Sequence, residues 1–134
     1  MIRRFFFYGT LMAGMGNRHE RAAHALLDEG RAAVVRGRLY AVPDRAGWYP
    51  ALLPGAGAVR GMVHGAQGRF DARAMARMDA YEGREYRRCR IKLGANAADA
   101  YVWRGPLPRG ACRIASGDFR GWLAARRGRR AYRA

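Results

Sequence analysis

The chain has 134 residues and is 50% hydrophobic, which suits one globular domain with a substantial core and is too short for two. Its formal net charge is +16, but Lys92 is the one lysine among 26 basic residues, which leaves 25 arginines scattered along the whole chain. Scattered charge is typical of a solvated surface, so the composition favours non-specific affinity for polyanions over a dedicated nucleic-acid site.

Several other classes of protein are not indicated. The two cysteines, Cys89 and Cys112, and the absence of a Cys/His cluster at metal-ligand spacing predict neither a disulfide framework nor a zinc site. The basic start is followed by an apolar run without a cleavage site, and no stretch is long enough to cross a bilayer. We therefore expect a cytoplasmic protein without a metal or cofactor.

The first predicted element is a buried strand that feeds a tight turn. Residues 5–12 carry no charge and begin with three phenylalanines and a tyrosine, which favours a strand buried on both faces. Gly9 lets the chain turn, and the backbone amides of Gly9, Thr10 and Leu11 can form a concave donor site for a carboxylate or phosphate. The alternative is a core strand followed by an ordinary loop.

The middle of the chain predicts a helix over residues 17–29, capped by Asn17 and closed by Gly30. Alternation predicts a strand over 31–40 and another over 59–65. Between them, residues 48–55 are aromatic and apolar but carry two prolines, which argues against a central strand and for a structured wall.

The second half predicts a helix that begins after Asp71 and ends at Glu82 and Gly83, then strands over 86–93 and 99–103. A short helix capped by Ser116 follows. Together these elements predict a single α+β domain over residues 1–125, a small mixed β-barrel of five or six strands with flanking helices, followed by a basic, mobile tail over 126–134.

Glu82 is the residue that departs from local rules. A carboxylate in the last turn of a helix faces the negative end of the helix dipole, where a cation would be stabilising, and this raises its pKa. Nearby Asp79 and Glu85, and burial beside a tyrosine, would also raise this pKa, whereas Arg84, Arg87 and Arg88 would lower it. A carboxyl group tuned toward neutrality can act as both general base and general acid. The alternative is an exposed glutamate paired to an arginine.

Four short motifs, taken together, resemble the gamma-glutamylcyclotransferase-like superfamily. They occur in order over residues 4–104, and the closest resemblance is to the branch of gamma-glutamylamine cyclotransferase and AIG2-like proteins. The motifs are Tyr8-Gly9-Thr10-Leu11, Tyr49-Pro50-Ala51-Leu52, the helix end Met78 to Gly83, and Tyr86-Arg87-Arg88.

The resemblance implies a barrel whose pocket is floored by the loop after the first strand. It implies that the amides of Gly9, Thr10 and Leu11 bind the glutamyl group of the substrate, that Glu82 is the acid/base residue, and that Tyr8 and Tyr86 lie at the pocket. The implied reaction is the attack of the substrate's α-amine on its own γ-carbonyl, which forms 5-oxoproline and expels an amine or amino acid. It needs no metal or cofactor.

Two observations leave the interpretation open. Met62 stands where family members often carry a carboxylate, which affects the expected pocket lining and substrate choice. The rival hypotheses are a non-catalytic module that binds a small amino-acid-like ligand on the same fold, and a basic nucleic-acid-binding protein. The leaving group and the oligomeric state are not indicated by the sequence.

Overall fold

The computed structural model describes residues 3–9, 18–125, 129 and 131. In chain order the elements are β1 (Arg4–Phe7), α1 (Arg18–His24), β2 (Arg31–Asp44), β3 (Gly47–Gly65), α2 (Ala72–Glu82), β4 (Tyr86–Leu93), β5 (Asn96–Trp103), β6 (Cys112–Arg113) and α3 (Phe119–Ala124). The six strands form one sheet in the order β4-β5-β1-β3-β2-β6.

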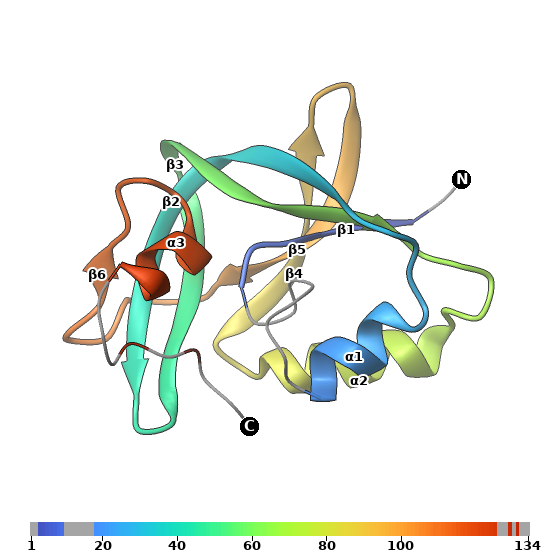
Figure 1. Cartoon of the computed structure of the whole chain (residues 1–134), viewed down its shortest axis with the longest axis horizontal. Coiled ribbons are helices and arrows are strands. Elements are labelled where there is room, and N and C mark those ends of the chain that lie inside the picture. The colour runs from blue at the N-terminus through green and yellow to red at the C-terminus, as the bar shows by residue number, and fades with distance from the viewer. Residues whose placement is uncertain (1–2, 10–17, 126–128, 130, 132–134) are drawn as a thin grey trace.

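The sheet is mixed and strongly curled (Figure 1). β1 pairs with β5 in parallel, and the other strand pairs are antiparallel. The long β2–β3 hairpin bends away from the β4–β5 hairpin (Figure 1). α1 and α2 lie together and pack against β1, a central strand, while α3 lies near β6 (Figure 1). The predicted α+β class with a curled sheet of five or six strands and flanking helices is confirmed.

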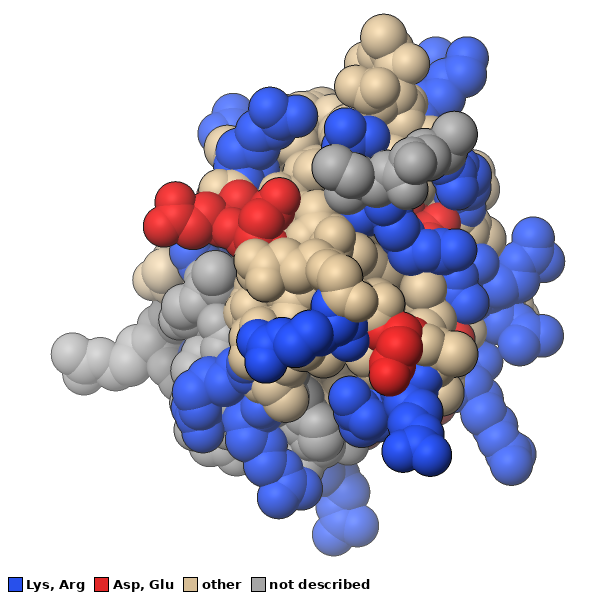
Figure 2. Space-filling model, turned by 90° about the vertical axis from the view of Figure 1, so that its right-hand side faces the viewer, with Lys and Arg blue, Asp and Glu red and all other residues tan. Residues whose placement is uncertain are grey.

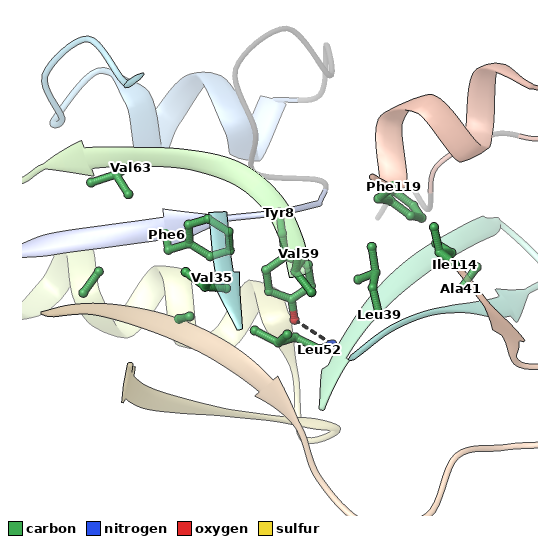
Figure 3. Packing of buried hydrophobic residues seen from close by; sticks show 12 residues of the cluster. Phe6, Tyr8, Val35, Leu39, Ala41, Leu52, Val59, Val63, Ile114 and Phe119 are labelled. Carbon is green, nitrogen blue, oxygen red and sulfur yellow. Dashed lines mark hydrogen bonds between the residues drawn. The ribbon is translucent and has the colours of Figure 1, made fainter. Parts of the chain in front are cut away.

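β1 is buried on both faces, as its uncharged aromatic run predicts. Alternate side chains point in opposite directions along a strand. Phe5 and Phe7 accordingly pack with Met78 and the other apolar residues of α1 and α2, whereas Phe6 and Tyr8 belong to the cluster inside the curled sheet (Figure 3). β1 therefore connects the two halves of the core.

The proline-containing segment, which the sequence argued could not be a central strand, is part of β3. Its placement nevertheless follows the rule that proline, which lacks an N–H group, avoids fully paired strands. β1 pairs with β3 over residues 62–65, whereas Pro50 lies where β2 is the paired neighbour. The register between β2 and β3 shifts between Arg36 and Arg38, opposite the Gly-rich stretch after Pro54.

The end of the first helix also differs from the prediction. α1 ends at His24 rather than near residue 29, because Leu27 forms a bridge with Ala66 and the Asp28 amide donates to the Gly65 carbonyl. The predicted N-cap Asn17 lies outside the described residues. α2 agrees closely, since the Asp71 carboxylate accepts a hydrogen bond from the Ala74 amide at 2.9 Å.

The cap of the third helix was predicted two residues too early. Asp118, not Ser116, is the N-cap of α3, and its carboxylate accepts from the Gly121 amide at 3.1 Å. The Ser116 hydroxyl instead accepts from the Asp118 amide at 3.3 Å. β6, a two-residue strand beside β2, was not predicted at all.

Basic side chains spread over the surface rather than along one stripe. Figure 2 shows lysine and arginine at many separate places on one face, with a few acidic groups between them. Most of the predicted tail lies outside the described residues; within it, the Arg129 guanidinium lies 3.5 Å from the centroid of the Trp122 ring. None of the described helices is long and apolar enough to cross a membrane.

Candidate active site

A cavity of about 660 Å³ opens where the end of β1 meets β3, the C-terminal half of α2 and the start of β4. Its volume lies within the range of roughly 300–1,000 Å³ that small-molecule sites usually have. Its walls are largely aromatic. They comprise Phe6, Phe7, Tyr8, Gly9, Arg18, Asp44, Tyr49, Pro50, Arg77, Ala80, Tyr81, Glu82, Gly83, Glu85, Tyr86 and Tyr101.

The structure therefore brings together four of the six predicted site residues. Tyr8, Gly9, Glu82 and Tyr86 all line the same cavity. Thr10 and Leu11 lie outside the described residues.

Gly9 lines the cavity, but the position requires glycine for a reason other than the predicted turn. It is not among the described glycines with a positive φ, so any residue could adopt its backbone conformation. A Cβ at this position would instead lie 2.2 Å from Cγ of Pro50. Glycine is required here because the chain after β1 packs directly against the β3 wall.

Glu82 is the last residue of α2, and its side chain is half-buried in the cavity wall. Gly83 follows it with a φ of +88°, a conformation that favours glycine, and the Gly83 amide donates to the Asp79 carbonyl at 3.2 Å. The sequence prediction of the helix end at Glu82 is thus confirmed. No hydrogen bond or ion pair to the Glu82 carboxyl is found among the described residues, unlike the arginine pairing that was the alternative.

This environment changes the acidity of Glu82. Burial raises its pKa from 4.5 to about 8, and the negative charge of Asp79, one helical turn earlier, acts in the same direction. The main cause is thus the loss of water around the carboxylate, rather than the helix dipole that the sequence emphasised. A carboxyl group of this kind can both take and return a proton near neutral pH.

The predicted tyrosines use their hydroxyl groups to hold the cavity walls together. The Tyr8 hydroxyl donates to the Tyr101 carbonyl and accepts from the Leu52 amide at 3.2 Å (Figure 3). The Tyr86 hydroxyl donates to the Pro50 carbonyl from the opposite side. Burial raises the pKa of both Tyr8 and Tyr86 well above the ordinary value, so both remain neutral phenols.

Several lining residues were not singled out from the sequence. Tyr101 was placed only on a strand, and the charged residues Arg18, Arg77 and Asp44 were not connected with a site. They come from β5, α1, α2 and β2, so only the tertiary structure shows that they meet. Within the described ranges, no group of three or more His, Cys, Asp or Glu side chains could hold a metal ion.

Comparison with protein families identifies the chain. The family model described as "Gamma-glutamyl cyclotransferase, AIG2-like" matches residues 5–121. The chain belongs to this family. The match confirms the resemblance drawn from the four motifs, and it extends beyond their last residue to include β6 and part of α3.

Several solved structures share the fold of this chain. An uncharacterized protein from Pyrococcus horikoshii has a TM-score of 0.68 at 22% identity, over 92% of this chain and 94% of its own. Protein ytfP from Escherichia coli is 30% identical over 87% of this chain and 95% of its own, with a TM-score of 0.58. Allophanate hydrolase from Kluyveromyces lactis matches 93% of this chain with only 21% of its own, at a TM-score of 0.72 and 13% identity. No curated protein matches the sequence.

Proposed function

We propose that this AIG2-like family member is a gamma-glutamylamine-type cyclotransferase, which releases 5-oxoproline and an amine or amino acid from a gamma-glutamyl compound. The observation that carries the proposal is the Glu82 carboxyl, which lies in the wall of the main cavity without a hydrogen-bond partner among the described residues and has a pKa raised to about 8. The family supports a cyclotransferase-type activity in general.

In the proposed reaction the α-amine nitrogen of the substrate attacks its γ-carbonyl carbon. Ionised Glu82 takes a proton from this nitrogen as the new C–N bond forms, and the protonated carboxyl then donates it to the departing amine nitrogen as the old C–N bond breaks. A peptide α-amino group has a pKa of about 8, similar to that of Glu82, so neither transfer is strongly uphill. One carboxyl group therefore suffices for both transfers.

The nucleophile and the electrophile belong to one molecule, so the protein has mainly to hold the folded-back conformer. In the proposed complex, backbone amides of Gly9, Thr10 and Leu11 bind the glutamyl group, and the rings of Tyr8 and Tyr86 confine it. Gly9, the described member of this loop, lies in the cavity wall against Pro50. The cavity is larger than a glutamyl group alone requires, which leaves room for the leaving group.

The remaining expectations form part of the same proposal. The substrate is a small gamma-glutamyl molecule, the reaction uses no metal or organic cofactor, and the protein works in the cytoplasm. The scattered arginines bind polyanions only non-specifically.

The test is the release of 5-oxoproline by purified protein from a panel of gamma-glutamyl amines and dipeptides. Glu82→Gln keeps the shape of the side chain but cannot carry the proton, so it should abolish turnover. Glu29→Gln is the matched control, because Glu29 is exposed and outside the cavity lining. Wild-type turnover by Glu82→Gln would refute the acid/base role. If the folded wild type releases nothing but panel ligands raise its melting temperature, the protein is a binding module instead.

A further inference from the structure

The Asp79 carboxylate is held by a hydrogen-bond network directly behind Glu82. Asp79 precedes Glu82 by three residues on α2, so the two side chains lie on the same face of the helix. Its Oδ1 accepts from the Tyr101 hydroxyl at 2.6 Å and from Arg88 Nε at 3.0 Å, and its Oδ2 lies 3.4 Å from Arg88 Nη2. Residues of β4 and β5 thus fix a negative charge beside the cavity.

Arg88 is shared between two carboxylates. Besides Asp79, its guanidinium lies 3.7 Å from the buried carboxylate of Asp99. Asp99 has a second cationic partner, since Arg3 Nη1 lies 2.6 Å from the same oxygen. Among the described ion pairs, Arg88 is therefore the cation that pairs with the Asp79 carboxylate.

The other titratable groups around Glu82 differ from Asp79 in charge or in exposure. Tyr8, Tyr86 and Tyr101 are neutral, because burial raises the pKa of each. The charged groups of the lining are exposed, so water and salt screen them. Among the described residues, the other titratable groups of the lining are Tyr8 after β1, Arg18 from α1, Asp44 from β2, Tyr49 from β3, Arg77 and Tyr81 from α2, Glu85 and Tyr86 around the start of β4, and Tyr101 from β5.

We propose that Asp79 is a positioning residue that controls the protonation of Glu82, and that Arg88 limits this control by pairing with the Asp79 carboxylate. The inference about the protonation of Glu82 does not depend on the proposed function. Only its consequence for catalysis, that Glu82 cycles a proton at neutral pH, rests on that function. A fixed negative charge disfavours the ionised form of a neighbouring carboxyl, and a cation on that charge weakens the effect. The pair Asp79–Arg88 thereby sets the pH range in which Glu82 can act as a base.

The proposal predicts shifts of opposite sign for two substitutions. Asp79→Asn keeps the shape but removes the charge, so the pKa of Glu82 should fall, by roughly 0.5 to 2 pH units for charges about 6 Å apart. Arg88→Gln leaves Asp79 unneutralised, so the pKa of Glu82 should rise. Glu29→Gln and Arg87→Gln are the controls of equal charge change, at exposed positions outside the cavity lining, and should leave it unchanged.

The pKa can be measured without any substrate. The chain has four glutamates, so ¹³C label at the side-chain carboxyl carbon gives few glutamate signals to follow by NMR from pH 4 to 10, and Glu82→Gln assigns the one of interest. Tyr101→Phe removes one hydrogen bond from Asp79 while keeping its charge, and serves as a second variant if Arg88→Gln fails to fold. It should leave the pKa of Glu82 raised.

A fall in Asp79→Asn together with a rise in Arg88→Gln supports the proposal. An unchanged Glu82 pKa in Asp79→Asn, or a shift of the same sign in both variants, overturns it. Because this titration needs no turnover, its result is independent of the 5-oxoproline assay. Opposite pKa shifts without any release of 5-oxoproline would support the role of Asp79 and Arg88 but reject the proposed function. Release of 5-oxoproline without pKa shifts would support the proposed function but reject the role of Asp79 and Arg88.

Discussion

Replacing Glu82 with glutamine should make the protein more stable, by an amount that grows with pH. The pKa of Glu82 is about 8 in the folded protein against 4.5 for an ordinary glutamate. Between these values the folded state holds a proton that the unfolded state releases, so the wild type loses stability as pH rises from about 4.5 to about 8 and no further above that. A glutamine at this position does not titrate and removes the loss.

The size of the effect follows from the two pKa values. Relative to the fully protonated state, ionisation of the unfolded chain lowers the free energy of unfolding by about 1 kcal/mol at pH 5 and about 4 kcal/mol at pH 8. The stability difference between Glu82→Gln and wild type should therefore grow by about 3 kcal/mol over this range. Because part of the Glu82 side chain stays in contact with water in the cavity, this is an upper figure.

Urea unfolding of both proteins at pH 5, 6, 7 and 8 measures this difference directly. All other titrating groups are common to both proteins, so they cancel, and any pH-independent effect of the glutamine amide cancels in the slope. Glu29→Gln should give a pH-independent difference from wild type. Parallel stability curves for wild type and Glu82→Gln would refute the claim that burial raises the pKa of Glu82.

Three further predictions concern the same cavity. The value of kcat/KM should rise with pH with a midpoint near the pKa of Glu82, about 8, because the free enzyme must ionise Glu82 to act as base; a profile that is flat from pH 6 to 9 would contradict this. Gly9→Ala should destabilise the protein by about 1–3 kcal/mol and reduce kcat/KM, because its Cβ would lie 2.2 Å from Cγ of Pro50. Urea unfolding measures the change in stability, and an unchanged stability would show that the cavity wall can move. Tyr86→Phe should lower the free energy of unfolding by about 1–3 kcal/mol, because it leaves the buried Pro50 carbonyl without the donor from Tyr86, yet it should retain turnover with a raised KM. A loss of kcat without a change in KM would instead show that the Tyr86 hydroxyl takes part in the chemistry.

The parts of the fold that could be predicted depend on local signals. A continuous, uncharged aromatic run predicted β1. Asp71 and Gly83 marked the two ends of α2, which was enough to place Glu82 at a helix end from its immediate neighbours in the chain. The short motifs of the family have the same character, because each depends on residues close together in the chain. These signals sufficed to nominate Glu82 and the loop that begins at Gly9.

The parts that failed depend on contacts between distant segments. α1 stops at His24 because the chain must return to the sheet and bridge Ala66, which no helical pattern encodes. The prolines were taken as evidence against a central strand. Pro50 lies in β3, where β2 is the one paired neighbour and the Tyr86 hydroxyl of β4 donates to the Pro50 carbonyl. The reason for Gly9 was equally non-local, since it is the distance to Pro50 rather than the backbone angle that demands glycine.

The distribution of hydrogen bonds in the cavity bears on how a substrate would be recognised. The hydroxyls of Tyr8 and Tyr86 each donate a hydrogen bond to a backbone carbonyl. Neither hydroxyl can therefore donate to a ligand without breaking a hydrogen bond that holds the cavity wall. Recognition of the charged end of a gamma-glutamyl group must then come from other donors. Among the described lining residues, the candidates are the backbone amide of Gly9 and the exposed guanidinium groups of Arg18 and Arg77. The tyrosines keep the walls in place, so that Glu82 remains shielded enough from water to hold its proton near neutral pH. In the proposed mechanism this makes both tyrosines necessary for acid/base catalysis, even though their hydroxyls are bonded elsewhere.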